Sequence, residues 1–209
     1  MAMPHFTDLT GLASVASAIA ASLLPFPGIA RLTKSYLAML LGAMFVLMLI
    51  PFSGMPIAAY VRGVTGDLSI TTLVLLWCAL LRPWCSSTKY NNRFALLILI
   101  ALPSLALYPM ALGAGAYDPY RLGYGDPLFI AALLLLALLA WRRRFSIIAL
   151  CIAFATLAWA VGWYESDNLW DYLLDPFVSI YALTVIMIHT VKTLLQRGRS
   201  HQSQPLLPG

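Results

Sequence analysis

The sequence predicts an all-α polytopic membrane protein, a bundle of about seven (six to seven) transmembrane helices with short loops and a short interfacial helix near 168–174. The prediction rests on composition, on a division into apolar blocks and on the distribution of charge. Of 209 residues, 61% are hydrophobic and only 10% are charged, and the mean hydropathy is +0.84. A soluble domain is about half apolar and a quarter charged, so this composition excludes an ordinary globular protein.

Seven apolar blocks follow one another, separated by short polar or Pro/Gly-rich stretches. They are 9–24, 36–52, 68–84, 94–114, 128–141, 145–163 and 176–195. A helix needs about 20 residues to cross the hydrocarbon core of a bilayer, and the blocks 94–114, 145–163 and 176–195 meet this length. Block 128–141 is short, but it runs into Arg142, whose long side chain can reach outward to the headgroups.

Block 9–24 is the weakest of the seven, because it is rich in Ala and Ser and is followed by Pro25 and Pro27. No basic residue precedes it, which is not typical of a secretory signal peptide. Its small residues Ser14, Ala18 and Ser22 recur four apart, a spacing that lets a neighbouring helix approach closely. We therefore expect a packed crossing, with a surface-lying segment as the alternative.

Charge sets the predicted orientation. If all seven blocks cross, the loops alternate between the two sides, and every Lys and Arg except Arg62 and Arg121 falls on one side. All eight acidic residues fall on the other: Asp8, Asp67, Asp118, Asp126, Glu165, Asp167, Asp171 and Asp175. The positive-inside rule then predicts a multi-pass protein of the cell inner (cytoplasmic) membrane with a cytoplasmic C-terminus. The N-terminus is outside if block 9–24 crosses.

The chain is predicted to form a single transmembrane helical domain over 1–195, followed by a flexible cytoplasmic tail over 196–209. The lipid bilayer is its first expected partner. The net charge of +5 does not indicate nucleic-acid binding, because the basic residues lie in cytoplasmic loops, where anionic lipid headgroups are their natural partners.

Three outer loops, 53–67, 115–126 and 163–175, carry most of the acids and are called the lid from here on. Apolar residues at 169, 170, 173 and 174 fit one or two turns of amphipathic helix at the membrane surface, with Asp167 as its cap. Asp167, Asp171 and Asp175 would then gather along one helix face. The aromatic side chains have a simpler explanation, because Trp and Tyr prefer the headgroup zone.

Other lid acids fit roles at the ends of helices. Asp126 and Asp175 each precede a proline and an apolar block, a pattern typical of an N-cap. Asp67 is predicted to cap the block that begins at Leu68, and Asp118, which precedes a proline, is predicted to open a turn.

Two interpretations of the remaining lid charges stay open. Arg62 and Arg121 can pair with lid carboxylates and tie the three loops together. Alternatively, the acidic ridge receives a cation from outside, such as a divalent ion, an amine-bearing substrate or a basic partner surface. The candidate binding cluster consists of Arg62, Arg121, Glu165, Asp167, Trp170 and Asp171.

Familiar catalytic and transport signatures are missing from the sequence. It contains no C-x-x-C, H-E-x-x-H, G-x-S-x-G or Walker A pattern, and no cofactor is evident. No charge lies in the middle of an apolar block, where ion-coupled carriers usually have one.

These observations favour an accessory or interaction subunit of an envelope process, which binds a membrane-protein partner through the lid. The first alternative is a membrane-interface enzyme acting on a lipid-linked or phospholipid substrate at the outer leaflet. In that enzyme Glu165 or Asp171 would serve as general base or metal ligand. Arg62 and Arg121 would hold phosphate. The second alternative is a facilitator for a small solute.

Overall fold

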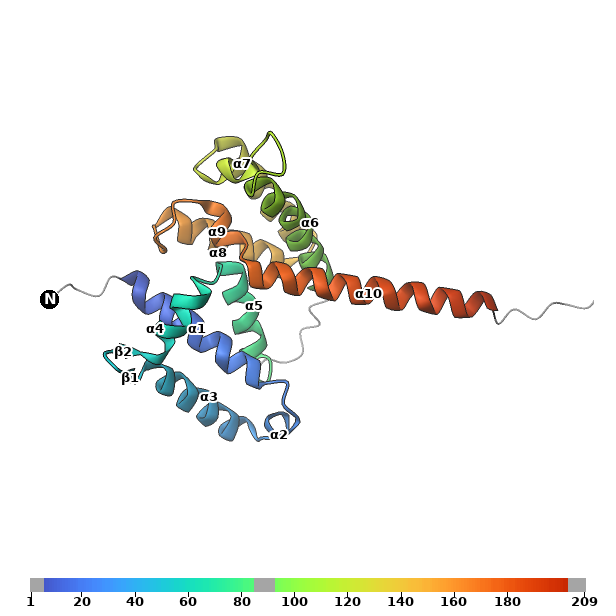
Figure 1. Cartoon of the computed structure of the whole chain (residues 1–209). Coiled ribbons are helices and arrows are strands. Elements are labelled where there is room, and N and C mark those ends of the chain that lie inside the picture. The colour runs from blue at the N-terminus through green and yellow to red at the C-terminus, as the bar shows by residue number, and fades with distance from the viewer. Residues whose placement is uncertain (1–5, 85–92, 203–209) are drawn as a thin grey trace, which may run out of the picture.

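The structure, a computed structural model, describes residues 6–84 and 93–202 and is mostly helical, at 76% (Figure 1). This confirms the predicted all-α class. The helices are α1 (Phe6–Leu23), α2 (Pro27–Ala30), α3 (Lys34–Leu49), α4 (Ile57–Thr65), α5 (Ile70–Leu81), α6 (Arg93–Ala111), α7 (Pro127–Arg142), α8 (Ser146–Ala160), α9 (Leu169–Leu173) and α10 (Pro176–Gln202), with a 3₁₀ helix η1 (Pro119–Gly123). A two-stranded antiparallel hairpin, β1 (Pro51–Phe52) and β2 (Met55–Pro56), completes the described elements.

Each predicted apolar block overlaps one of the longer helices, namely α1, α3, α5, α6, α7, α8 or α10, and the short helix predicted near 168–174 is α9. Among the described residues, two segments are long and apolar enough to cross a bilayer, Arg93–Ala111 and Pro176–Gln196. The 12 residues of α5 span only about 18 Å, against a hydrocarbon core of about 30 Å. Helix length therefore does not establish the predicted seven crossings.

The lid loop that follows α3 is more ordered than its Pro and Gly content indicates. It forms the hairpin and then α4, and the Tyr60 hydroxyl of α4 donates a hydrogen bond of 2.9 Å to the Phe52 carbonyl of β1. Gly66 ends α4 with a φ of 71°, a left-handed conformation that favours glycine.

The predicted N-caps are confirmed at two of four helices, and the fourth, that of α9, is described with the lid below. A carboxylate oxygen of Asp126 accepts from the Phe129 amide at 2.9 Å, and one of Asp175 accepts from the Val178 amide at 2.9 Å. The Asp67 prediction is wrong, because α5 begins at Ile70 and its cap is Ser69. Asp118 opens η1 as expected, since its side chain accepts from the Tyr120 amide at 3.0 Å.

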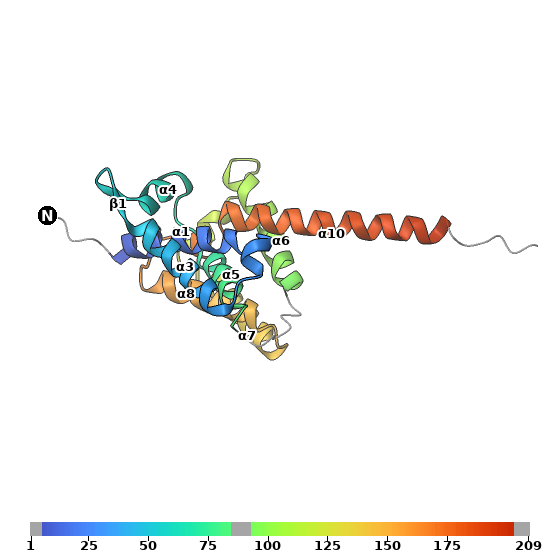
Figure 2. The same cartoon turned by 90° about the horizontal axis from the view of Figure 1, so that it is seen from below.

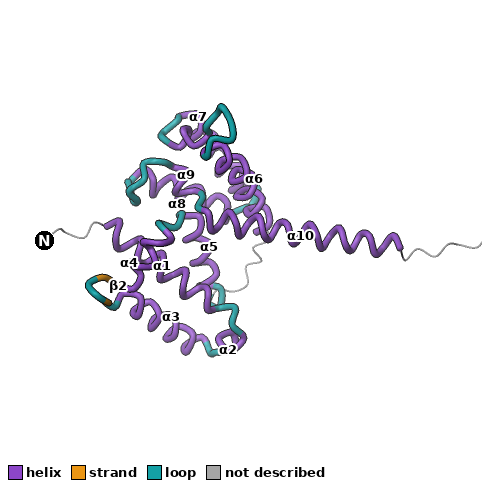
Figure 3. The backbone as a smooth tube through the Cα atoms, in the orientation of Figure 1, coloured by secondary structure: helices purple, strands orange, loops and turns teal. Residues whose placement is uncertain are grey.

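The main core lies around α8, which packs on α5, α7 and α9, whereas α6 packs mainly on α10. A smaller cluster of Val15, Ala16, Met48 and Ala58 joins α1 to α3 and α4. Figures 1 and 2 show α3 beside α1, with α2 at the turn between them. The tube view of Figure 3 shows that helices make up most of the described chain and that the strands lie at the hairpin near α3 and α4.

The last helix is the longest. It extends to Gln202, well beyond the other elements in both views (Figures 1 and 2), and so includes the first residues of the predicted tail 196–209. Residues 203–209 lie outside the described part of the chain, and the flexibility of the tail stays a prediction.

Candidate functional site

Two loops of the lid are joined by the carboxylate of Asp171. The Tyr120 hydroxyl donates to both of its oxygens, at 2.9 and 2.8 Å, and the Ser166 hydroxyl donates to Oδ2 at 2.5 Å. Tyr120 belongs to η1 in the loop 115–126, whereas Ser166 and Asp171 belong to the loop 163–175. Hydroxyl donors therefore compensate this half-buried carboxylate, whereas one of the two interpretations of the sequence expected an arginine to do so.

Asn168 makes a second connection between the same loops. Its side-chain oxygen caps α9 by accepting from the Trp170 amide at 2.9 Å, and its Nδ2 donates to the Tyr120 carbonyl at 2.9 Å. The predicted cap Asp167 is therefore wrong by one position. A Cβ on Gly123 would lie 1.7 Å from the Asn168 oxygen, so this close approach requires glycine at 123.

Trp170 is part of the lid interior and is half-buried. Its indole nitrogen donates to the Pro119 carbonyl at 3.0 Å, and its ring lies 4.6 Å from the ring of Phe129 on α7. The side chain thus connects α9 to both η1 and α7, a role more specific than the headgroup preference of tryptophan.

The loop 163–175 also reaches the start of α5. The buried Tyr164 hydroxyl donates to the Leu68 carbonyl at 2.7 Å, and its ring stacks on that of Tyr172 with centroids 5.0 Å apart. The Tyr172 hydroxyl in turn accepts from the Tyr164 amide at 3.0 Å and donates to the Ser166 carbonyl at 3.0 Å.

Asp175 lies apart from Asp171, because α9 ends at Leu173 and the chain is extended at Leu174. The predicted row of carboxylates on one helix face therefore does not form. Asp175 is 4% exposed, and its Oδ2 accepts from the Ser69 amide at 2.9 Å and from the Thr72 hydroxyl. A single carboxylate thereby caps α10 and binds the N-terminal end of α5.

Arg62 forms a bidentate ion pair with Asp67, with Nε–Oδ1 at 2.7 Å and Nη2–Oδ2 at 3.0 Å. This pair lies between α4 and α5. A Cβ on Gly11 of α1 would lie 2.3 Å from Arg62 Nε, so α1 approaches the pair closely. The predicted arginine–carboxylate pairing thus occurs, but this pair lies within the α4–α5 connection and is not what joins the lid loops.

The six candidate residues occupy three different environments. Arg62 is paired with Asp67; Asp171 and Trp170 are half-buried inside the lid; Arg121, Glu165 and Asp167 are exposed. Within the described chain, no three His, Cys, Asp or Glu side chains come together as a metal site. A divalent cation at the acidic cluster stays a prediction.

Burial raises the pKa of three lid tyrosines. The effect is largest at Tyr120 and Tyr164, and at Tyr120 the hydrogen bond to Asp171 and its negative charge raise the pKa further. Burial also raises the pKa of Tyr172. At neutral pH all three hydroxyls therefore stay protonated and available as donors.

Sequence reasoning missed Tyr120, Ser166 and Asn168 as members of the site. Asn168 had a local signal, because asparagine is a favoured cap before an apolar run. Tyr120 and Ser166 had none, since each role depends on a contact made by folding.

No protein-family model matches the chain, and neither a curated protein nor a solved structure is significantly similar to it. The function is therefore argued from the geometry of the lid.

Proposed function

We propose that the chain is a multi-pass protein of the cytoplasmic membrane, with seven crossings and a cytoplasmic C-terminus, and that it serves as an interaction subunit of an envelope process. In this proposal the lid faces outward and its exposed surface binds a membrane-protein partner.

Support for this topology comes from the contacts of the acidic segments. Hydrogen bonds join the loop 163–175 both to η1 and to the beginning of α5, so these segments lie together at one end of the molecule. Alternating crossings require them to share one side. The crossings shorter than about 20 residues are accommodated by outward-reaching arginines and by local thinning of the bilayer.

The single observation that carries the interaction function is the closed lid. Both carboxylate oxygens of Asp171 accept hydrogen bonds from hydroxyl groups of the lid itself, and Arg62 forms an ion pair with Asp67. A phosphate-binding or general-base site needs these groups to converge on a substrate, so the enzyme alternative has less support.

The exposed surface of the lid has the composition of a protein-binding surface. It presents Arg121, Glu165 and Asp167 beside exposed aromatic side chains. The aromatic residues are Tyr117, Tyr124 and Trp163, with 57%, 62% and 47% of their surface exposed. Aromatic residues and Arg are enriched at interfaces, and charges at the rim control which partner is accepted.

The test is co-purification from native membranes in mild detergent, with the partner identified by mass spectrometry. The double variant Glu165→Lys/Asp167→Lys reverses the exposed lid charge and is expected to lose the partner. Arg31→Glu, an exposed charge reversal on another loop, is the matched control and is expected to keep it. Recovery of a partner-free wild-type monomer, or equal recovery of the partner in both variants, would contradict the proposal.

A further inference from the structure

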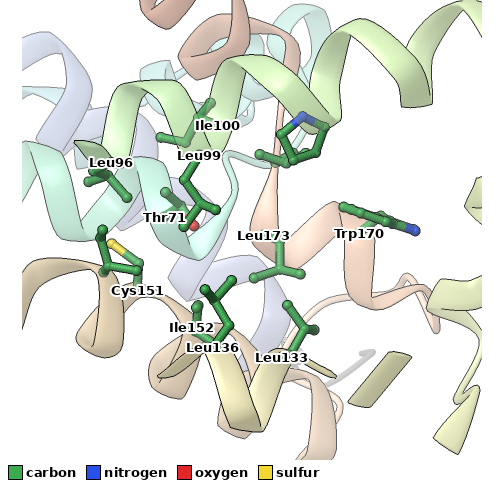
Figure 4. Close-up of a pocket in the computed structure, with 13 residues that line it drawn as sticks. Thr71, Leu96, Leu99, Ile100, Leu133, Leu136, Cys151, Ile152, Trp170 and Leu173 are labelled. Atoms are coloured by element: carbon green, nitrogen blue, oxygen red, sulfur yellow. The ribbon is translucent and has the colours of Figure 1, made fainter. Parts of the chain in front are cut away.

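A continuous apolar groove runs between α6 and α7 over the surface of α8. Its section near the lid, of about 90 Å³, is lined by α5, α6, α7, α8 and α9, and Figure 4 shows Leu96, Leu99 and Ile100 facing Leu133 and Leu136 across it. A second section of about 230 Å³ continues toward the α7–α8 turn. Both sections are lined by Leu99, Leu136 and Ile148, so they adjoin one another.

The groove exists because α6 and α7 pack on different neighbours. α7 packs on α8, and α6 packs on α10 and η1. Trp170 and Leu173 of α9 line the section of the groove near the lid, so the lid closes that end of the groove. The other end lies beside Phe145 and the exposed side chain of Arg143.

The dimensions fit one acyl chain. From Ala95 to Pro103 the groove follows α6 for about 12 Å, which is close to the roughly 15 Å depth of one leaflet. The two sections of the groove have volumes of about 90 and 230 Å³. A partner helix, about 10–12 Å wide with its side chains, does not enter a space of this size.

The positive charge at the Arg143 end of the groove indicates which kind of lipid headgroup would bind there. Arg143 belongs to the run Arg142–Arg144, which lies on the cytoplasmic side of the proposed topology. Basic pockets between transmembrane helices on this side bind anionic headgroups, and arginine suits phosphate because it donates two parallel hydrogen bonds.

We propose that the groove binds one anionic glycerophospholipid of the cytoplasmic leaflet, with an acyl chain between α6 and α7 and its phosphate at Arg143. This inference rests on the proposed membrane topology. It assigns the lipid to a defined site, distinct from the lipid that surrounds any membrane protein.

The test is native mass spectrometry of the purified full-length chain, titrated with phosphatidylglycerol or with phosphatidylcholine. The wild type is expected to retain one phosphatidylglycerol and to release phosphatidylcholine. Leu136→Trp fills the groove and is expected to lose the retained lipid. Leu135→Trp, whose parent side chain is 58% exposed on the same helix, is the matched control and is expected to keep it.

A second pair of variants leaves the packing intact. Arg143→Gln is expected to weaken phosphatidylglycerol binding about five-fold, the effect of one arginine at an anionic surface, whereas Arg31→Gln is expected to leave it unchanged. Equal lipid retention by the two tryptophan variants, equal retention of both lipids, or a co-purifying polypeptide that Leu136→Trp releases would overturn the proposal. The partner bound through Glu165 and Asp167 is expected to stay with Leu136→Trp, which separates failure of the lipid site from failure of the interaction function.

Discussion

At the scale of single residues, closure of the lid depends on a glycine. Gly123 lets the Asn168 side chain approach η1, where it binds the Tyr120 carbonyl while capping α9. Any larger residue at 123 must displace this side chain and so break both hydrogen bonds.

Gly123→Ala is expected to destabilise the protein by about 2 kcal/mol, because one helix cap is lost and the partly buried Tyr120 carbonyl is left without its donor. The matched control is Gly42→Ala in α3, where an added Cβ has no neighbour within 4 Å and alanine is the better helix former. Thermal unfolding in detergent measures both variants. Equal melting temperatures would show that the Asn168 contact does not stabilise the lid.

Tyr120 gives the lid a dependence on alkaline pH. Folding raises the pKa of the Tyr120 hydroxyl. The contribution of this protonated hydroxyl to the free energy of unfolding is therefore complete below the ordinary tyrosine pKa of about 10. It is lost as the pH rises from there toward the higher pKa of the folded protein. Melting temperatures measured from about pH 8 to 11 are expected to fall less steeply in Tyr120→Phe than in the wild type. Tyr117→Phe removes a hydroxyl from an exposed side chain of the same loop and is expected to follow the wild-type curve.

At the scale of elements, Asp175 determines how α5 and α10 meet. Its replacement by alanine leaves three buried donors, on Ser69, Thr72 and Val178, without this acceptor. We expect a loss of at least about 3 kcal/mol in the free energy of unfolding.

Asp126→Ala is the comparison for that variant. Asp126 also precedes a proline and caps a helix, but within the described part of the chain its carboxylate accepts a hydrogen bond only from the Phe129 amide. We expect a loss of about 1 kcal/mol, typical of a cap alone. Denaturant-induced unfolding measures the free energy of unfolding of both variants. A similar loss of free energy in Asp175→Ala and Asp126→Ala would mean that Asp175 does not connect α5 to α10.

The elements were predictable from sequence to the extent that their signals are local. Apolar blocks and Asp-Pro caps depend on neighbouring residues, and they located the helices of the bundle, including those that begin at Pro127 and Pro176. The hairpin and α4 were missed, because prolines and glycines in 53–67 indicate a loop when read alone. The contact of Tyr120 with Asp171 joins residues far apart in the chain, and no local pattern specifies it.

At the scale of the whole molecule, the proposed topology places the lid carboxylates and most of the basic residues on opposite sides of the bilayer. Hydrogen bonds gather the acidic loop 163–175 with η1 and the beginning of α5. The basic run Arg142–Arg144, by contrast, lies at the turn between α7 and α8, at the opposite end of α7 from η1. Both the proposed partner surface and the proposed lipid site assign these two ends to opposite sides of one bilayer.

Labelling of single cysteines with a membrane-impermeant thiol reagent tests this claim most directly. Cys78, Cys85 and Cys151 are first replaced by serine, and Tyr117→Cys or Arg143→Cys is then introduced. In intact spheroplasts the account predicts labelling at 117 and protection at 143, with both positions labelled once the membrane is opened. Labelling at 143 but not at 117 in intact spheroplasts would reverse the topology, and equal labelling at both would show that no bilayer separates them.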